Sequence, residues 1–600
     1  MGNMKFANRS QIPVEYRWDI DRMYPGDSTW ERDIKAAEGL VEKILSFRGK
    51  ISRSASNLSD VLEGQDKISL LIERAFVYTH MKLDEDNRSS TWQEANSVVL
   101  SRASEISASV SFITPEITAM PVAKIRLFIN EEPRLNVYRH LLEDTIRQKK
   151  HILSKKEESL MANMSNVTSA PGTIFSMIND ADISFGNVED NSGNKINLTH
   201  GNYIDCMRSD DRLLRKNAYT SCYSAYKSLS NTLASVYNTS VQRNVLNAKI
   251  RKFKSARQAA LSSDNIPESV YDHLVKNVND RLPVMHSYLK GKKNILGIDR
   301  MMMYDVYVPV IKAPKGDYTF EDAISLCVEA LSPLGKDYIE KFKSGIVDRW
   351  IDVYETPGKT SGAFSFGSYD SLPYILLNFD GKLEDVFTII HEMGHSMNSF
   401  YTRSTQPYVY GDHAIFTAEV ASTVNETLLM NYLLEKTESG DLRKYILNMY
   451  LEAYRTTLFR QTMFAEFENE THKYVEAGGS LTAVNLCDIY GSLNKKYFGD
   501  DTETDDYIKF EWARIPHFYN AFYVYQYATG YSAAAAIAEK ILSGDNDYIA
   551  KYLDFLSSGT NDYPLEILKI AEVDMSKPEP VIRALDKFES LVDMFLNKEG

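Results

Sequence analysis

Apolar residues recur at helical spacing along most of the chain. Val270, Leu274, Val278 and Leu282 lie four residues apart, which places their side chains on one face of a helix. Similar periods run through 92–112, 216–246, 321–344 and 441–476. The pattern therefore predicts a mainly α-helical protein.

Two short pairs of strands interrupt this helical pattern. In the first, the segments 183–188 and 196–198 flank a turn at 190–193 that ends in glycine, which is typical of a hairpin. In the second, the segments 362–366 and 374–379 flank a turn at 368–373. We place a domain boundary at the first hairpin. It divides the chain into an N-terminal helical domain (1–200) and a catalytic domain (201–600).

Composition and charge narrow the range of functions. The 600 residues are 44% hydrophobic and 25% charged, which is enough to bury a large core. The formal net charge of -14 argues against nucleic acid as a partner, because phosphate binding needs a basic surface. No stretch is apolar enough to span a membrane, and no secretory signal is evident. We expect a cytoplasmic protein without nucleic acid or membrane partners. Its oligomeric state stays unknown.

The strongest chemical signal is an H-E-x-x-H motif at residues 391–395. On a helix, His391 and His395 share one face and can bind one cation, while Glu392 can reach a water beside that cation. Zinc lowers the pKa of a bound water towards ~7, and an adjacent carboxylate can then accept its proton. We therefore predict one zinc ion per chain, with Glu392 as the general base.

A catalytic zinc site of this kind needs a third protein ligand. Asn398 and Tyr401 stand where the longer motif H-E-x-x-H-x-x-G-x-x-H requires glycine and histidine, so that class of site is excluded. Downstream candidates are His413, Glu419 and Glu426. The two glutamates lie seven residues apart among small and apolar residues, on one helical face. We assign Glu419 to the metal and Glu426 to a hydrogen bond with a ligand histidine, with His413 as the competing ligand.

Several segments together carry a family resemblance. They are D-V-F-T-I-I-H-E-M-G-H at 385–395, F-T-A-E-V-A-S-T-V-N-E at 416–426, S-G-A-F-S-F-G at 361–367 and I-P-H-F-Y-N-A-F-Y-V-Y-Q-Y-A-T-G at 515–530. In these segments the chain resembles the thimet oligopeptidase family of zinc peptidases, in particular its bacterial oligoendopeptidase F branch. The resemblance implies a mainly α, bowl-shaped zincin fold with a deep substrate channel and small β elements near the active site. It also implies cleavage inside short peptides.

The resemblance also implies particular site residues. The zinc site maps to His391, His395 and Glu419, and the general base maps to Glu392. The family carries a histidine and tyrosine donors that stabilise the oxyanion, and His517 and Tyr527 match these best. Tyr523 and Tyr525 remain alternatives for the tyrosine donors.

The substrate can be held by main-chain pairing. The strand at 374–379 directly precedes the zinc helix, and an edge strand there would pair with an extended peptide. We therefore expect Tyr374, Leu376 and Asn378, together with Tyr523, to contact the substrate. Alternatively, this strand only packs against the helix.

The leading hypothesis is a zinc-dependent endopeptidase that hydrolyses internal bonds of oligopeptides. One alternative is an exopeptidase of similar fold, such as a dipeptidyl carboxypeptidase. That enzyme needs a fixed Arg or Lys for the terminal carboxylate of the substrate, and the sequence does not identify one. Another alternative is a non-catalytic, zinc-containing peptide-binding protein. Glu392 argues against it, because a structural zinc site has no use for a base.

Overall fold

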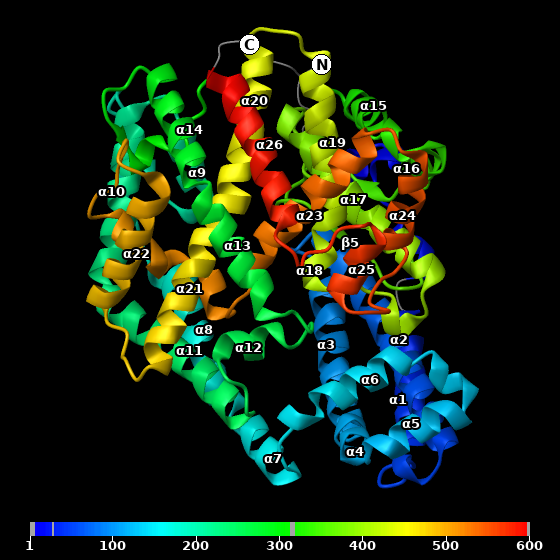
Figure 1. Cartoon of the computed structure of the whole chain (residues 1–600). Helices are drawn as coiled ribbons and strands as arrows, with labels where there is room; N and C mark the ends of the chain where they lie inside the picture. Colours follow the sequence, from blue (N-terminus) through cyan, green and yellow to red (C-terminus); the bar gives the residue numbers. More distant parts are fainter. Residues whose placement is uncertain (1–5, 27–28, 313–317, 597–600) are drawn as a thin grey trace. The chain divides into compact units, whose positions relative to one another are not determined.

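Helices dominate the structure, as the hydrophobic periodicity predicts. The computed structural model describes residues 6–26, 29–312 and 318–596, and it is 71% helical with only small sheets (Figure 1). Within these residues, no helix combines the length and the hydropathy that a bilayer crossing requires. The prediction of a mainly α protein is therefore confirmed.

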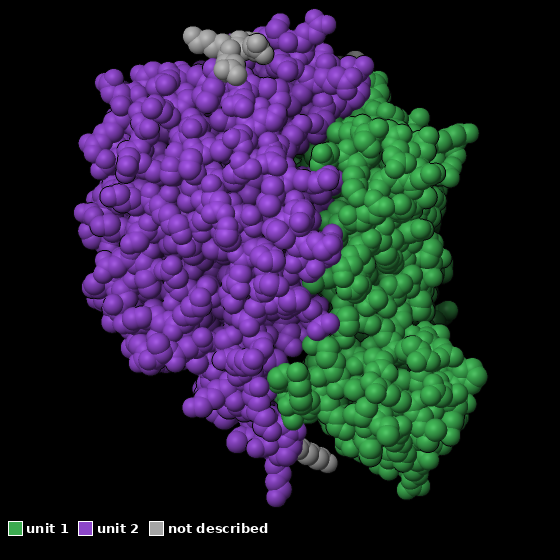
Figure 2. Space-filling view, viewed as in Figure 1, with its two compact units in different colours: residues 1–152, 315–429, 537–573 green, residues 153–314, 430–536, 574–600 purple. Residues whose placement is uncertain are grey.

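The chain forms two compact units, each built from three separate segments. Unit 1 comprises residues 1–152, 315–429 and 537–573, and unit 2 comprises residues 153–314, 430–536 and 574–600 (Figure 2). The predicted domain boundary at residue 200 falls inside unit 2, so the units do not coincide with the predicted domains. Contacts between segments far apart in sequence define each unit, and local sequence patterns do not reveal such contacts.

Unit 1 contains the H-E-x-x-H motif. Its elements are α1 (Trp30–Leu45), α2 (Ala55–Glu85), α3 (Ser90–Val110), α4 (Ile113–Ala119), α5 (Val122–Glu131), α6 (Arg139–Gln148), α15 (Phe320–Ala330), α16 (Lys336–Val347), β4 (Ile351–Asp352), β5 (Phe364–Phe366), β6 (Tyr374–Leu376), α17 (Leu383–Thr405), α18 (Ile415–Ala418), the first part of α19 (Val420–Lys436), the end of α23 (Tyr525–Leu542), α24 (Asn546–Leu556) and α25 (Pro564–Ile570).

Helices α1 to α6 of unit 1 enclose an apolar core. The buried face of α1 includes Ala37, Val41 and Ile44, which are spaced for one side of a helix, and α1 packs on α2. Leu58 of α2 and Ile125 of α5 are fully buried in the same core. Figure 1 shows these helices, in blue to cyan, gathered together. These helices support the sheet against which the motif helix α17 packs.

A three-stranded sheet lies between α2 and the motif helix α17. Strand β6 is its central strand, paired in parallel with β4 and antiparallel with β5. Tyr374 and Leu376 pack with Val77 and Met81 of α2, whereas Ser365 of β5 faces the other way, with its Oγ 2.8 Å from the Ser396 Oγ of α17. Alternate residues of a strand point to opposite faces, so one face of the sheet packs on α2 and the other contacts α17.

The prediction that 374–379 forms a peptide-binding edge strand is wrong. Both sides of β6 are already paired, and Tyr374 and Leu376 are fully buried. The Asn378 amide donates to the carbonyl oxygens of Thr360 and Gly362, at 2.9 and 2.8 Å. These three residues stabilise the sheet, and the alternative hypothesis, a strand that packs the helix, describes β6 correctly.

Unit 2 is almost entirely helical. Its elements are α7 (Lys155–Asn163), α8 (Ser165–Ser176), β1 (Asn187–Glu189), β2 (Lys195–Asn197), α9 (His200–Arg208), α10 (Arg212–Ser228), α11 (Ser230–Ile250), α12 (Ala256–Leu261), α13 (Glu268–Asp280), α14 (Leu282–Ile295), β3 (Met301–Met302), the rest of α19, α20 (Asp441–Ala453), α21 (Arg460–Glu476), α22 (Ala483–Phe498), β7 (Thr502–Glu503), the start of α23 and α26 (Glu579–Leu596).

The predicted hairpin near residue 190 is confirmed, with β1 antiparallel to β2. The long period at 216–246 forms two helices, because α10 ends at Ser228 and α11 begins at Ser230. The period at 441–476 runs from α20 to α21 through a π-helical segment at Tyr454–Phe459. Apolar periodicity thus finds the helices but not every break between them.

Candidate active site

Helix α17 presents its motif histidines at the surface of unit 1. Val386, Ile389 and Ile390 are fully buried, as the apolar flank of the motif predicts. His391 and His395 keep 26% and 24% of their side-chain surface exposed. The apolar side of the helix anchors it, and the two imidazoles remain accessible to a ligand.

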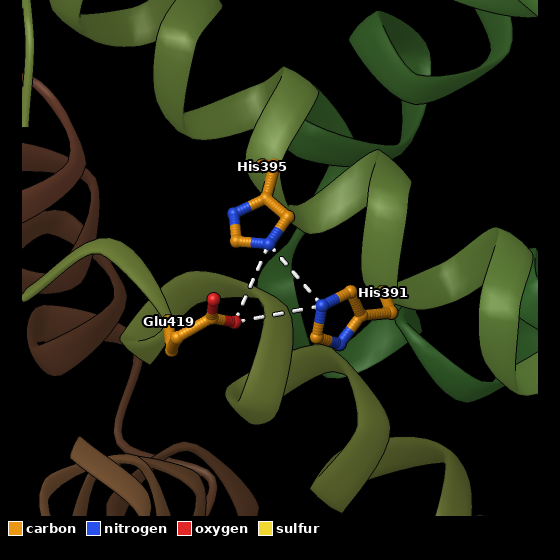
Figure 3. Close-up of side chains that lie close together, drawn as sticks. All are labelled: His391, His395 and Glu419. Carbon is orange, nitrogen blue, oxygen red and sulfur yellow. Dashed lines mark hydrogen bonds and ion pairs between the residues drawn. The ribbon is translucent and has the colours of Figure 1, made fainter. Parts of the chain in front are cut away.

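Glu419 joins the two histidines in a compact triangle (Figure 3). The Nε2 atoms of His391 and His395 are 3.2 Å apart, and they lie 3.5 and 3.4 Å from Glu419 Oε2. In the described part of the chain, no other group of His, Cys, Asp or Glu side chains brings three ligand atoms together in this way. The structure therefore gathers the three residues that the sequence assigned to the metal.

The spacing of these atoms suits zinc. Tetrahedral zinc with ligands at about 2.0–2.2 Å sets its ligand atoms about 3.3–3.6 Å apart. The three observed distances, 3.2, 3.4 and 3.5 Å, agree with this value. Two imidazoles and one carboxylate are also the donor set of a catalytic zinc site, which keeps a fourth position open.

Glu426 determines which nitrogen of His391 can bind a metal. Its Oε1 lies 3.0 Å from His391 Nδ1, so the ring donates from Nδ1, and Nε2 is the nitrogen at which a cation would replace the proton. Burial lowers the pKa of His391, but the hydrogen bond and charge of Glu426, with the charges of Glu392 and Glu419, raise it to about 9. The predicted hydrogen bond between Glu426 and a ligand histidine is present.

A residue close to Glu419 in sequence holds its side chain in place. It follows α18 directly, and the Ser422 hydroxyl donates to Glu419 Oε2 at 3.1 Å. Burial raises the pKa of Glu419, but the hydrogen bond from His395 and the charges of both histidines lower it to about 2. The carboxylate is thus ionised and pre-oriented as a ligand.

A glycine allows α17 and α19 to approach closely enough to build this triangle. A Cβ atom on Gly394 would lie 2.6 Å from the Cα and 2.9 Å from the N of Ser422. Asn425 of α19 also donates to the Ile390 carbonyl of α17, at 3.2 Å. Gly394 is the x residue before the second histidine, and the motif gave no signal for its packing role.

Glu392 lies beside the three candidate ligands and interacts electrostatically with all of them, but it is not part of their triangle. It is 8% exposed, and its carboxylate accepts a hydrogen bond from the main-chain N–H of Ser365. Burial raises the pKa of Glu392, and the charges of His391 and His395 oppose the shift. A carboxyl whose pKa is raised towards neutrality is suited to accept and return a proton. Ser365 was not identified from the sequence, because its role depends on strand register.

Strand β5 has a free edge beside this base. Phe364 and Phe366 pair with Leu376 and Tyr374 of β6, while the N–H of Ser365 points away from β6 to Glu392. Within the described residues, β5 pairs with β6 alone. The edge that could accept an extended peptide is therefore at β5, one strand away from the predicted one.

Sequence comparison assigns this arrangement to a family. The profile of peptidase family M3 matches residues 206–587, and the profile of oligopeptidase F matches residues 116–185. The chain belongs to peptidase family M3. Members of this family are metallopeptidases, which agrees with the His-His-Glu triangle, and the family resemblance in the sequence is confirmed. The two matched ranges lie on either side of residue 200.

Relatives of this M3 peptidase span nearly its whole length. Oligopeptidase PepF of Bacillus subtilis (strain 168) is 42% identical over 589 residues, which cover 98% of this chain and 88% of the relative. The crystal structure of oligoendopeptidase-F from Enterococcus faecium is 35% identical, with a TM-score of 0.75, and covers 95% of this chain and 98% of its own. A crystal structure from Chlamydophila abortus is 34% identical, with a TM-score of 0.92, and covers 99% and 100%.

The remaining candidate residues of the M3 peptidase lie in unit 2. The rings of His517 and Tyr523 are stacked with centroids 5.9 Å apart, and the Tyr527 hydroxyl donates to the Tyr523 hydroxyl at 3.3 Å. Tyr525 is 2% exposed and packs on Tyr271, so it does not belong to this group. Burial and the charge of Arg460 lower the pKa of His517, which keeps its imidazole neutral.

A strained turn supports these side chains. Phe522 has a φ of +57°, which is unfavourable for a residue other than glycine. Its N–H donates to the fully buried Glu468 Oε1 at 3.0 Å, and its ring packs on His472. Glu468 therefore holds the turn that immediately precedes Tyr523. This contact joins two residues 54 positions apart, so local sequence patterns do not predict it.

Proposed function

We propose that this M3 peptidase is a zinc-dependent endopeptidase that hydrolyses internal bonds of short oligopeptides. The observation that carries the proposal is the triangle of His391, His395 and Glu419 at zinc spacing, with Glu392 beside it. Two of the relatives are named Oligopeptidase PepF and oligoendopeptidase-F, which supports the choice of short peptides and of internal cleavage.

In this proposal His391, His395 and Glu419 hold one zinc ion. A zinc ion held there would polarise the scissile carbonyl and acidify a water molecule. Glu392 accepts the proton of the attacking water and delivers it to the leaving amine. The hydrogen bond from the N–H of Ser365 keeps the Glu392 carboxylate in position for both transfers.

The oxyanion requires hydrogen-bond donors, and we assign this role to His517 and Tyr527. Support comes from their shared position with Tyr523 in unit 2 and from the lowered pKa of His517. A neutral imidazole can donate one hydrogen bond as negative charge develops on the substrate oxygen. The approach of this group to the metal ligands stays a prediction, as does the deep channel.

Metal analysis tests the ligand set. We expect one zinc ion per chain, strong loss of zinc in Glu419→Ala, and retention of zinc in His413→Ala. His413 is the matched control because it was the competing candidate and lies outside the triangle. Retention of zinc in Glu419→Ala together with its loss in His413→Ala would contradict the assignment.

Cleavage of a blocked peptide tests the mode of attack. A short, internally quenched peptide is offered with free termini and with both termini blocked. An endopeptidase cuts both, because it recognises the peptide on each side of the scissile bond. A dipeptidyl carboxypeptidase loses activity when the terminal carboxylate is blocked. A peptide-binding protein with structural zinc cuts neither.

A further inference from the structure

A cavity of about 770 Å³ adjoins the metal ligands within unit 1. His395, Ser399 and Arg403 of α17 line one wall, each one helical turn after the last, so the face that carries the metal ligands continues into the cavity. From His395 to Arg403 this wall extends about 12 Å at 1.5 Å per residue. The volume is within the usual range of ligand pockets, about 300–1,000 Å³.

Three carboxylates, those of Asp66, Glu73 and Asp412, line the cavity. Asp66 and Glu73 lie seven residues apart on one face of α2, and Asp412 precedes α18. Asp66 accepts from the Tyr138 hydroxyl at 2.7 Å, and Glu73 accepts from the Tyr369 N–H at 2.8 Å. Across the ranges that the structure covers, none of the three forms an ion pair with Lys or Arg.

The cations in the cavity wall do not balance these carboxylates. Arg403 donates to the carbonyl oxygens of Ser368 and Gly367, at 2.9 and 3.0 Å, so its guanidinium is used to hold the chain after β5. The Nε2 of His413 is buried with no hydrogen-bond partner among the residues described. Burial lowers the pKa of His413 to about 4, so it adds no positive charge. The carboxylates outnumber the single guanidinium.

The apolar part of the lining suits an elongated side chain. Leu62 and Phe76 of α2, with Leu141 and Phe366, contribute hydrocarbon surface to the lining. Lysine and arginine have this character, because an apolar stem carries the charge at its end. Burial raises the pKa of both Asp66 and Glu73, whereas the hydrogen bonds from Tyr408 and Tyr369 and the charge of Arg403 oppose the shift at Glu73.

We propose that this cavity is the subsite that binds a positively charged group of the peptide, near the scissile bond, through Asp66, Glu73 and Asp412. The charged group is a Lys or Arg side chain or the N-terminal ammonium. The proposal rests on the proposed function, because it places a peptide at His395. It names Asp66 and Glu73 as specificity-determining residues of the M3 peptidase.

The test compares arginine with citrulline, which has nearly the same shape and no charge. Short, internally quenched peptides carry one or the other at each position in turn, and kcat/KM is measured on the zinc-loaded enzyme. We expect arginine to be preferred about tenfold at one position, which is the size of one charged hydrogen bond. Acetylation of the N-terminus separates the two sources of charge. If the arginine side chain binds in the cavity, the preference for arginine persists after acetylation. If the N-terminal ammonium binds there, acetylation lowers kcat/KM.

Binding is measured separately from turnover. The zinc-loaded Glu392→Gln variant is titrated with the arginine and citrulline peptides, and the same ratio of affinities is expected. Asp66→Asn and Glu73→Gln should each reduce the ratio in both assays. Asp60→Asn is the matched control, since Asp60 lies on the same helix, is exposed and pairs with Arg134 outside the cavity. It removes an equal charge and should leave the ratio unchanged.

The outcomes separate this proposal from the proposed function. If both peptides are cleaved at equal rates at every position, and acetylation has no effect, the subsite proposal is wrong and the peptidase proposal stands. A preference for glutamate would also overturn it and would indicate anion binding at Arg403. Failure to cleave any peptide would instead contradict the proposed function.

Discussion

Glu426 Oε1 lies 3.0 Å from the Nδ1 of His391, on the side of the ring opposite the Nε2 that faces Glu419. The carboxylate therefore selects the tautomer in which Nε2 is a ligand. It also fixes the direction of the ring, because Nδ1 has a partner in α19 while the histidine itself is in α17. An outer residue of this kind contributes to metal affinity without touching the metal.

Replacement of Glu426 should weaken zinc binding. We expect Glu426→Ala to lower the affinity by about 10- to 100-fold, as for other outer partners of ligand histidines. Glu426→Gln keeps an oxygen that can accept from Nδ1, so its loss should be smaller. Competition with a chelator measures the affinity of each variant. Equal affinities for Glu426→Ala and the unmodified protein would contradict the role of this hydrogen bond.

Glu392→Gln should retain zinc and lose turnover. The amide has the size of the carboxylate and leaves the three ligands intact, but it cannot accept the proton of the attacking water. A fall in kcat of about 100- to 10,000-fold is expected. Zinc content and kcat are measured on the same sample. Loss of zinc along with activity would show that Glu392 is a ligand.

Gly394→Ala should disturb the metal site through packing alone. The added Cβ would meet the main chain of Ser422 at 2.6 Å, and overpacking of this kind costs about 1–3 kcal/mol. We expect a lower melting temperature and a lower zinc affinity. Gly39→Ala in α1 is the control, because nothing lies within 4 Å of its Cβ. That change should stabilise the protein slightly, since alanine favours helices. Similar effects in both variants would contradict the close-approach argument.

Glu468→Leu should reduce kcat without removing zinc. It leaves the buried N–H of Phe522 without an acceptor, at a cost of about 1–3 kcal/mol, and releases the turn before Tyr523. Glu468→Gln retains an oxygen acceptor and should keep most of the activity. Melting temperature, zinc content and kcat are compared for both variants. A kcat of Glu468→Leu equal to that of the unmodified protein would show that this turn does not position the donors.

The grouping of the candidate metal ligands could be predicted from sequence because much of its geometry is local. His391 and His395 are one helical turn apart, and Glu419 and Glu426 are two turns apart, so spacing alone aligns each pair. The apolar flank of the motif likewise predicted which side of α17 is buried. Only the meeting of the two pairs depends on tertiary packing, and Gly394 makes that packing possible.

The position of β6 could not be predicted in the same way. Its composition indicates a strand, but its neighbours in the sheet decide whether it lies at an edge. One neighbour, β4, is only two residues long and pairs with β6 through Ile351 and Ile375, 24 positions apart. Pairing of such short strands leaves no periodic signal. The roles of Ser365 and Glu468 could not be predicted for a related reason. Each depends on a contact between a main-chain N–H and a side chain far away in sequence.

The alternation of segments between the two units constrains the order in which the protein can fold during its synthesis. Helices α1 to α6 have a core of their own and can fold during translation. Helix α17 can complete its packing only after its later partners have been synthesised. Thr402 of α17 donates to the Leu556 carbonyl of α24 at 2.7 Å, in a buried contact. Unit 1 therefore reaches its final form only after residue 573 has been translated. Until then the nascent peptidase lacks the segment against which α17 packs, which delays the appearance of proteolytic activity until that segment has been synthesised.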